Sequence, residues 1–223
     1  MFEEIRKDEI DPKSDTQRRI IEAAGEIFAE SGYEHTTIRT ICNRASVNVA
    51  AINYHFGGKK NLYLAVLKFW RANAFEKYPF DPTDLSTGTP EERLHAFVRT
   101  LLFRVLDEGE GSPFARLMAR ELIQPTSGFD VMVEETMRPY FAFLATTVGQ
   151  LFATPPPEMT VNLCCLSIVG PVFHLFIGRH AMRRLLHREN LNRQEIELVA
   201  DHITRFSLYA IREIAANSEG ESA

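Results

Sequence analysis

Apolar residues recur along most of this chain at intervals of three and four positions, which is the period of one face of an α-helix. The first such segment runs from Thr16 to Ser31, and Gly32 follows it as a C-terminal stop. Its inward positions are Ile20, Ala24, Ile27 and Phe28. No stretch alternates strictly between apolar and polar residues, as a half-buried strand would. The pattern therefore predicts an all-α protein of about nine helices in total.

Two short helical segments follow, separated by a break at 46–48. Thr36 and Thr37 are suited to cap the first of them, and the pair Gly57-Gly58 can end the second. Two short helices joined by a tight turn and braced by a preceding helix are typical of a helix-turn-helix unit, whose second helix enters the major groove of DNA. The pattern therefore predicts an N-terminal three-helix DNA-binding domain.

The rest of the chain is interpreted as a larger helical domain. Pro90 opens a helix, and a kink at Pro139 is expected inside a helix over 129–152. The last two long helices, near 160–186 and 193–216, carry apolar residues on more than one face or along their full length, which suits helices that serve both a core and a partner. The predicted parts are a disordered acidic lead-in at 1–13, the DNA-binding domain at 14–60 with its helix-turn-helix motif at 37–56, a connecting helix at 61–79, the larger domain at 80–216 and a disordered tail at 217–223.

One apolar run, VNLCCLSIVGPVFHLFI at 161–177, can be mistaken for a membrane span. It is about one turn shorter than the roughly 20 residues that a span needs, and Asn162, Gly170-Pro171 and His174 interrupt it. We interpret it as a buried core helix. The three cysteines form no disulfide framework and no zinc-ligand spacing, so a reducing cytoplasm is the expected location.

The net charge of −5 conceals a strong asymmetry. Eight basic and four acidic residues lie between 16 and 71, and no acidic residue occurs from Thr36 to Arg71. Such a segment is typical of a surface that meets nucleic-acid phosphates. The run NYHFGGK at 53–59 lies within it, but a nucleotide-binding loop would need a glycine where Asn53 stands and a Ser or Thr where Lys60 stands. Lys59, at the start of the next helix, is therefore expected to meet a phosphate of DNA.

Positions 16 to 67 resemble the N-terminal domain of TetR-family transcriptional regulators, in the first-helix alanine and phenylalanine, Gly32-Tyr33, Thr36-Thr37, the run 54–56 and Lys59. Two departures from the family pattern are Cys42 in the second helix and Ser46 in the turn, where the family usually has Ala and Gly. If the turn needs a positive φ, Ser46 costs about 1 kcal/mol relative to glycine. Phe56 is interpreted as part of the core.

The resemblance implies which side chains meet DNA. Phosphate contacts are implied for Thr37, Tyr54, His55 and Lys59. Base contacts are implied for Arg39 and for the recognition-helix positions Asn48, Val49, Ala50, Ala51 and Asn53. Asparagine can pair twice with adenine, whereas valine and alanine can only contact a thymine methyl group. Phosphates are therefore expected to supply most of the affinity.

Three sequence motifs resemble the CecR-like subgroup of the same family: RELIQPT at 120–126, RP at 138–139 and SIVGPVF at 167–173. Family members form dimers through their last two long helices and bind a small effector in the larger domain. An aromatic, largely apolar pocket would favour a hydrophobic or aromatic effector. The expected pocket residues are Phe97, Leu101, Arg104, Phe114, Met118, Glu121, Tyr140, Phe173 and His174.

Glu121 lies in the middle of an apolar helix face, where an unpaired carboxylate is costly. Two interpretations remain open: a structural ion pair with Arg104, Arg138 or His174, or a polar anchor for an effector.

The favoured function is a repressor that binds a palindromic operator on double-stranded DNA as a homodimer and is released by its effector. An activator of the same fold, and a helical interaction protein that does not bind DNA, are the alternatives. An enzyme is disfavoured, because the single Glu-x-x-His at Glu92 and His95 cannot build a di-metal site and no nucleophile motif is present. No metal and no cofactor are expected.

Overall fold

The computed structural model describes residues 15–86, 88–106, 113–187 and 191–220. Every regular element in these residues is helical, which confirms the predicted all-α class. The contacts divide the chain into two compact units. The first unit contains residues up to 77 together with 112–131, and the second contains 78–111 together with 132–223.

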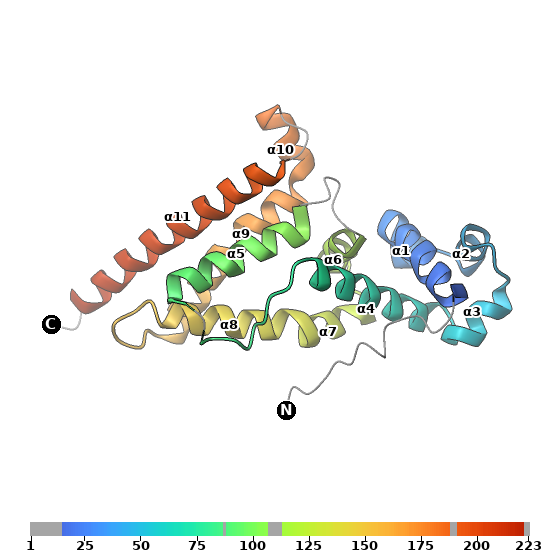
Figure 1. Cartoon of the computed structure of the whole chain (residues 1–223), viewed down its shortest axis with the longest axis horizontal. Helices are drawn as coiled ribbons and strands as arrows, with labels where there is room; N and C mark the ends of the chain where they lie inside the picture. Colours follow the sequence, from blue (N-terminus) through green and yellow to red (C-terminus); the bar gives the residue numbers. More distant parts are fainter. Residues whose placement is uncertain (1–14, 87, 107–112, 188–190, 221–223) are drawn as a thin grey trace. The chain divides into compact units, whose positions relative to one another are not determined.

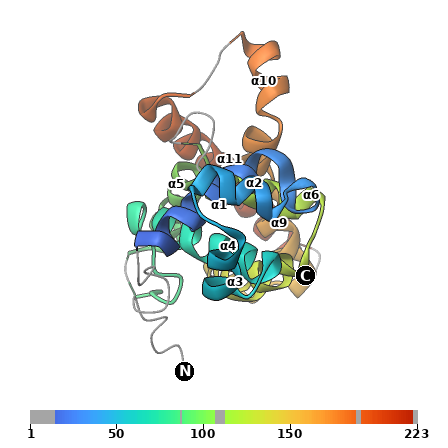
Figure 2. The same ribbon diagram turned by 90° about the vertical axis from the view of Figure 1, so that its right-hand side faces the viewer.

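The first unit is built around two long helices, α1 (Asp15–His35) and α4 (Lys59–Lys77). The short helices α2 (Ile38–Ala45) and α3 (Val49–Phe56) lie between them in the sequence and pack at one end (Figures 1 and 2). Its fully buried side chains include Ile20, Ala24, Phe28, Ile41, Ile52, Leu62 and Val66. On α1 the buried residues Ile20, Ala24 and Phe28 recur every four positions, as the apolar spacing predicted, while Ile27 is only half-buried.

Two glycines shape α1. The indole of Trp70 on α4 lies against Gly25, where a Cβ atom would collide with it, so the two helices approach closely. Gly32 has φ 78° and ψ 169°, which interrupts the helix where the sequence predicted its end. A last turn then continues to His35.

Helix α6 (Pro113–Ile123) and most of α7 (Ser127–Met132) also belong to the first unit. Arg116 on α6 forms an ion pair with Glu26 on α1 (2.8 Å). Arg120 donates from Nε to the carbonyl of Ala29 (2.8 Å) and from its terminal nitrogen to the carbonyl of Glu30, near the C-terminal end of α1. The sequence-based boundaries assigned these residues to the domain at 80–216, because tertiary contacts over such separations leave no local pattern.

The second unit contains α5 (Pro90–Leu106), α8 (Arg138–Gly149), α9 (Glu158–Ile177), α10 (Arg179–Leu186) and α11 (Arg193–Gly220). Helix α5 packs against α8, α9 and α11. Ion pairs connect α5 with α11 at Glu91–Arg212 (3.6 Å) and Arg99–Glu197 (2.6 Å), and His95 Nε2 lies 2.8 Å from Asp201 Oδ1. Its core side chains include Leu94, Val98, Leu102, Leu144, Val148, Cys165, Ile168 and Val172.

Both of the long helices predicted for the middle of this region are interrupted. A π-helical segment, η2 (Val133–Met137), precedes α8, so the irregularity lies one turn before Pro139. A proline ring crowds the carbonyl four residues earlier, and a widened turn at that place relieves the crowding. The predicted helix over 160–186 divides at Gly178 into α9 and α10, and α11 extends to Gly220 rather than 216. The predicted lead-in at 1–13 lies outside the described residues.

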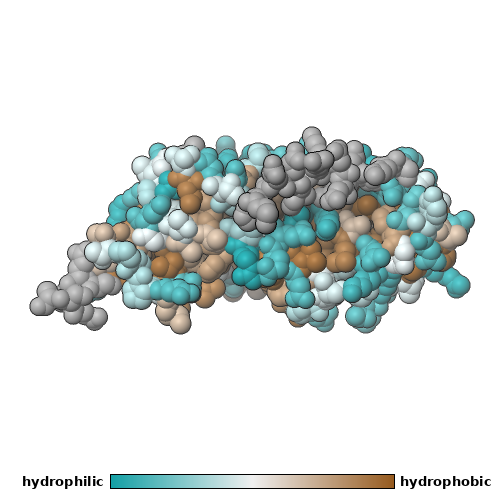
Figure 3. Space-filling model, turned by 90° about the horizontal axis from the view of Figure 1, so that it is seen from below, coloured by the Kyte–Doolittle hydropathy of each residue, from teal (hydrophilic) through white to brown (hydrophobic). Residues whose placement is uncertain are grey.

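Helix α9 is long and apolar enough to cross a membrane by length and composition, the only such helix in the described residues. Only 28% of its apolar window is buried in the single chain, so it is less buried than the expected core helix. It packs against α5, α8, α10 and α11, as a helix of a folded domain does. Apolar exposure is not unusual in itself: the face of the molecule in Figure 3 shows several apolar patches separated by hydrophilic atoms.

Candidate nucleic-acid interface

The start of α2 is held by two adjacent threonines that act differently. Thr36 is buried, and its hydroxyl donates to the carbonyl of Gly32 (2.7 Å). Thr37 is exposed and caps the helix, since its Oγ1 accepts from the backbone N–H of Thr40 (3.1 Å). The Thr40 hydroxyl lies 2.8 Å from Thr37 Oγ1. The cap therefore presents two exposed hydroxyl groups beside each other.

The turn between α2 and α3 has the positive φ at Ser46 that was considered in the sequence analysis. Ser46 has φ 53° and ψ 49°, the left-handed region, so the condition for its cost of about 1 kcal/mol is met. The backbone N–H of Val47 donates to the carbonyl of Cys42 (3.0 Å), and Arg19 on α1 donates to the carbonyl of Ala45 (2.7 Å). These bonds satisfy the carbonyls at the end of α2 and set the direction of the recognition helix.

Asn48 is the N-cap of the recognition helix α3. Its Oδ1 accepts from the backbone N–H of Ala51 (2.9 Å). That oxygen is used inside the protein, so Asn48 has only its NH₂ group to offer a base, and the two-bond contact with adenine requires both groups. The sequence interpretation missed this, although an asparagine before an apolar run is also a capping signal.

Arg39, also a predicted base-contact residue, is exposed on α2, and the other predicted positions lie on the solvent side of α3. Val49 is 47% exposed, Ala50 and Asn53 are exposed, and Ala51 is half-buried. Ile52 between them is completely buried and attaches the helix to the core. The predicted base-contact positions of α3 therefore offer small apolar groups and one carboxamide, that of Asn53.

Two glycines join α3 to α4. Gly57 has φ 72° and caps α3 through its N–H, which donates to the carbonyl of Asn53 (2.9 Å). Gly58 has φ 133°, which only glycine adopts readily, and α4 begins at the next residue. Tyr54 is 86% exposed and stands beside the ring of His55. Phe56, predicted to lie in the core, is only half-buried, and Ile52 is the fully buried residue of α3.

Lys59 occupies the first position of α4, where unpaired backbone N–H groups favour an anion. Its ammonium lies 4.4 Å from the centre of the Tyr33 ring and 3.4 Å from the carbonyl of Glu34. A cation held on the face of an aromatic ring has a restricted position. The charge is therefore held at the start of α4, against Tyr33.

The ten predicted DNA-contact residues thus lie within one short stretch, on α2, α3 and the start of α4, and no acidic residue interrupts it. Hydroxyl, imidazole, guanidinium and ammonium groups on such a surface can bind phosphate oxygens. The prediction omitted Thr40 and Lys60, which are also exposed there. The spacing of Thr40, three residues after a threonine cap, is a signal that could have identified it. No group of three or more metal-binding side chains occurs in the described residues.

The predicted effector residues do not all lie in one unit. Phe114, Met118 and Glu121 belong to the first unit and are buried there, while the other six belong to the second. In the second unit Phe97 packs in a cluster of aromatic rings with Phe80, Tyr140 and Phe143. The buried guanidinium of Arg104 donates to Tyr140 Oη (2.8 Å), and desolvation lowers its pKa. His174 is exposed.

Among the hollows formed by the described residues, three are lined by residues other than the predicted effector residues. One of about 330 Å³ lies between α9 and α11, one of about 380 Å³ lies beside Trp70 and the turn at Ser46, and one of about 330 Å³ lies beside Phe80 and Arg93. The assignment of the effector residues therefore stays a prediction.

The fold and this surface define a helix-turn-helix DNA-binding protein. Residues 20–66 match the family model for bacterial regulatory proteins of the tetR family, and residues 90–211 match the one for the C-terminal domain of the HTH-type transcriptional dual regulator CecR. The chain belongs to the TetR family of transcriptional regulators and has a CecR-type C-terminal domain.

Individual relatives agree with this assignment. The chain is 23% identical over 199 residues to the HTH-type transcriptional dual regulator CecR of Shigella flexneri, covering 84% of this chain and 87% of the relative. It is 38% identical over 58 residues to the repressor AcnR of Corynebacterium glutamicum, covering 26% of this chain and 31% of the relative. The second match is confined to the length of a DNA-binding domain.

Solved structures share the fold. A TetR-like regulator from Rhodococcus sp. RHA1 superposes with a TM-score of 0.65 at 15% identity, covering 89% of this chain and 98% of that one. FadR from Bacillus subtilis, solved with stearoyl-CoA, gives 0.61 at 17% identity, covering 86% and 97%. AibR, solved with isovaleryl coenzyme A and operator DNA, gives 0.59 at 21% identity, covering 73% and 86%.

Proposed function

We propose that this regulator binds a palindromic operator as a homodimer, represses transcription there, and leaves the DNA when a small hydrophobic or aromatic effector binds the larger domain. Each copy places α3 in the major groove, and Thr37, Tyr54, His55 and Lys59 bind the phosphates on either side of it. The cytoplasm is the matching location.

The observation that carries the proposal is the acid-free surface over 37–59, with Tyr54 almost fully exposed and Lys59 held at the start of α4. A large aromatic side chain that is 86% exposed gains nothing for the fold. Beside helix N-termini and basic groups, its hydroxyl can donate to a phosphate oxygen.

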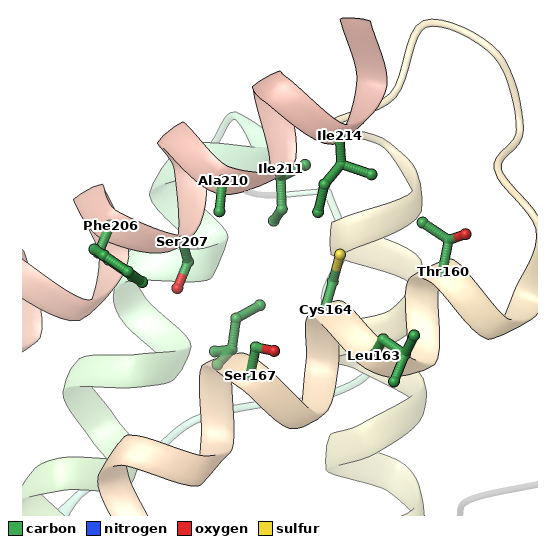
Figure 4. A pocket seen from close by; sticks show the side chains of 10 residues that line it. Thr160, Leu163, Cys164, Ser167, Phe206, Ser207, Ala210, Ile211 and Ile214 are labelled. Atoms are coloured by element: carbon green, nitrogen blue, oxygen red, sulfur yellow. The ribbon is translucent and has the colours of Figure 1, made fainter. Parts of the chain in front are cut away.

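Dimerisation is proposed to use α9 and α11. Leu163 and Leu166 on α9, and Phe206 and Tyr209 on α11, are each more than half exposed in the single chain. The hollow between the two helices is lined by apolar and small polar side chains that face one another (Figure 4). Apolar surface of this extent is buried when a second copy packs against it in a four-helix arrangement.

The effector class rests on the aromatic character of the second unit and on the ligands named for relatives of the same fold. FadR and AibR were solved with acyl thioesters of coenzyme A. Coenzyme A thioesters of different chain length are therefore the first ligands to test, with aromatic compounds as the second group. A compound that lowers operator affinity in proportion to its own binding is an effector of the proposed kind.

Repression is proposed rather than activation, and relatives carry both descriptions: AcnR is named a repressor and CecR a dual regulator. Transcription in vitro from the bound promoter decides between them. A repressor lowers transcript yield as protein is added, and an activator of the same fold raises it.

The test of DNA binding is a titration against the DNA upstream of the protein's own gene, and then against genomic fragments, at two salt concentrations. The Tyr54→Ala/Lys59→Ala variant is compared with wild type. Lys77→Ala is the matched control, because Lys77 is an exposed lysine at the other end of α4. Tight, salt-sensitive binding that only the double variant loses supports the proposal. Weak and salt-insensitive binding by all three proteins would favour the helical interaction protein instead.

A further inference from the structure

Glu121 on α6 is 1% exposed and accepts three hydrogen bonds, all from neutral groups. The Tyr63 hydroxyl donates to its Oε1 (2.5 Å), and Thr126 donates its hydroxyl to Oε1 (2.8 Å) and its backbone N–H to Oε2 (2.9 Å). These donors replace the ion pair that the sequence suggested with Arg104, Arg138 or His174. The Arg138 side chain pairs with Glu134 instead (2.6 Å).

The cluster of Tyr63, Glu121 and Thr126, here called the latch, joins three segments of the first unit. Tyr63 belongs to α4, Glu121 to α6, and Thr126 to the turn between α6 and α7. The start of α7, directly after this turn, also lies very close to α4: a Cβ atom on Gly128 would stand 2.5 Å from Leu67 Cδ1 and 3.2 Å from the Tyr63 ring. The position of this turn and the position of α4 therefore depend on each other.

Tyr63 also contacts the DNA-facing end of the unit. Its ring centre lies 5.0 Å from that of Tyr33 and 4.8 Å from that of Phe28. Tyr33 in turn carries the Lys59 ammonium on its face, at 4.4 Å. Lys59 and Tyr63 are four residues apart on α4 and so lie on the same side of that helix. A continuous series of contacts thus runs from Glu121 to the proposed phosphate-binding lysine, entirely within the first unit.

The chemistry of the latch favours a role in positioning α4 over a role in stabilising the fold alone. A buried carboxylate generally adds no stability over an apolar side chain of the same size, whereas its hydrogen bonds define one geometry. Burial and the neighbouring carboxylate raise the pKa of Tyr63, so its hydroxyl stays protonated and remains a donor. The segment 113–131 is also joined along the chain, at both of its ends, to residues of the second unit.

We propose that the latch of Tyr63, Glu121 and Thr126 positions the start of α4 for DNA binding, and that release of the segment 113–131 from α4 lowers operator affinity by displacing Tyr33 and Lys59. The proposal rests on the DNA-binding function proposed above. In it Glu121 is a positioning residue and not an anchor for the effector. A closed latch corresponds to the DNA-binding state.

The test compares Tyr63→Phe, Glu121→Gln and Lys59→Ala with wild type in operator titrations at several salt concentrations. Tyr63→Phe removes only the hydroxyl, and Glu121→Gln keeps an oxygen that can accept part of the hydrogen bonds. The control is Thr146→Val, which deletes a hydrogen-bonded hydroxyl in the second unit. We expect affinity to fall about tenfold in Tyr63→Phe and less in Glu121→Gln, and the salt slope to fall by about one phosphate contact, as in Lys59→Ala. Thr146→Val is expected to bind as wild type does.

A purely structural role would lower the melting temperature of Tyr63→Phe without changing the salt slope, and this result overturns the proposal. Adding Tyr63→Phe to Lys59→Ala should cause little further loss, because both act on the same contact. Amide hydrogen exchange of the free proteins gives a second measurement that needs no DNA. Exchange near residues 59–63 should increase in Glu121→Gln, and unchanged protection there also overturns the proposal. If wild type itself binds no operator, the proposed function fails, while the exchange result still decides whether the latch holds the start of α4.

Discussion

The two units of this protein differ in where they leave apolar side chains. In the first, the large exposed apolar residues of the described chain are Val49, Tyr54 and Ile123, and two of these lie on the proposed DNA surface. In the second they are far more numerous: Phe141, Met159, Leu163, Leu166, Ile177, Leu185, Leu198, Phe206, Tyr209 and Ile214. The first unit has a complete core and a polar, basic outer face, whereas the second has a core whose outer helices lack a covering. An apolar surface that folding leaves uncovered is available for assembly.

The largest expected effect comes from placing charge on the uncovered surface. Leu163→Asp/Phe206→Asp should weaken self-association at least about 1000-fold, because four large apolar side chains per dimer, each contributing about 1.5–3 kcal/mol, are replaced by charges. Sedimentation velocity over a range of concentrations measures the change. Ile123→Asp is the control, since Ile123 is similarly exposed (64%) but belongs to the first unit. Equal weakening by Ile123→Asp would show that the interface lies elsewhere.

The second experiment asks whether the two cores are independent. Phe28 in the first unit and Phe103 in the second are both fully buried, and replacing either by alanine should cost about 3–5 kcal/mol. Phe28→Ala should raise amide exchange mainly in α1 to α4, and Phe103→Ala mainly in α5, α8, α9 and α11. Exchange that rises equally throughout the chain in both variants would mean that the units unfold together.

A smaller effect is expected from pH. Burial raises the pKa of the Cys165 thiol to about 12, because the thiolate would be desolvated in the core of the second unit. The unfolded chain loses this proton first as pH rises, so the contribution to stability is complete below the ordinary thiol pKa and is lost between there and the folded value. Denaturant melts at pH 8 and 10 should differ by about 1–2 kcal/mol from this group. Cys165→Ala should reduce that difference, and an unchanged difference in this variant would assign the pH dependence to other groups.

The smallest expected effect concerns one strained residue in each unit. Ser46 and His187 are the two non-glycine residues with positive φ in the described chain, at 53° and 51°. Replacing either by glycine should stabilise the protein by about 0.5–1 kcal/mol, since glycine adopts this region without a clash. Thermal melts of Ser46→Gly and His187→Gly, with Ser86→Gly as a control at negative φ, measure the gain. A loss of stability in Ser46→Gly would show that the turn is not strained.

The difference between the two units also explains which structural features could be predicted from the sequence. The first three helices were predicted because their signals are local: apolar residues at helical spacing, a threonine cap before α2 and two glycines after α3. Their close spacing along the chain leaves few alternative arrangements. The positive φ of Ser46 was also foreseeable, because the turn has to reverse direction within a few residues.

The attachment of α6 was not foreseeable in the same way. Glu121 was recognised as a polar residue on an apolar face, but its donor Tyr63 lies 58 positions away and looks in the sequence like any core aromatic. The break at Gly178 was missed because the apolar period continues through it, whereas the irregularity at η2 lies one turn before Pro139, where the sequence predicted a kink. The capping role of Asn48 competes with base contact, and the residue type alone is compatible with both.

The apolar surface of α9 and α11 also affects how selectively this protein would form a homodimer rather than a dimer with a different chain. Helix α9 carries no Asp, Glu, Lys or Arg after Glu158, so this part of the proposed interface has little charge with which to repel a different chain that bears a similar apolar stripe. Apolar attraction is not directional, and rejection of a wrong partner then depends on how side chains fill spaces such as the hollow beside Cys164. A mispaired dimer would carry two different recognition helices and would read an operator whose halves differ.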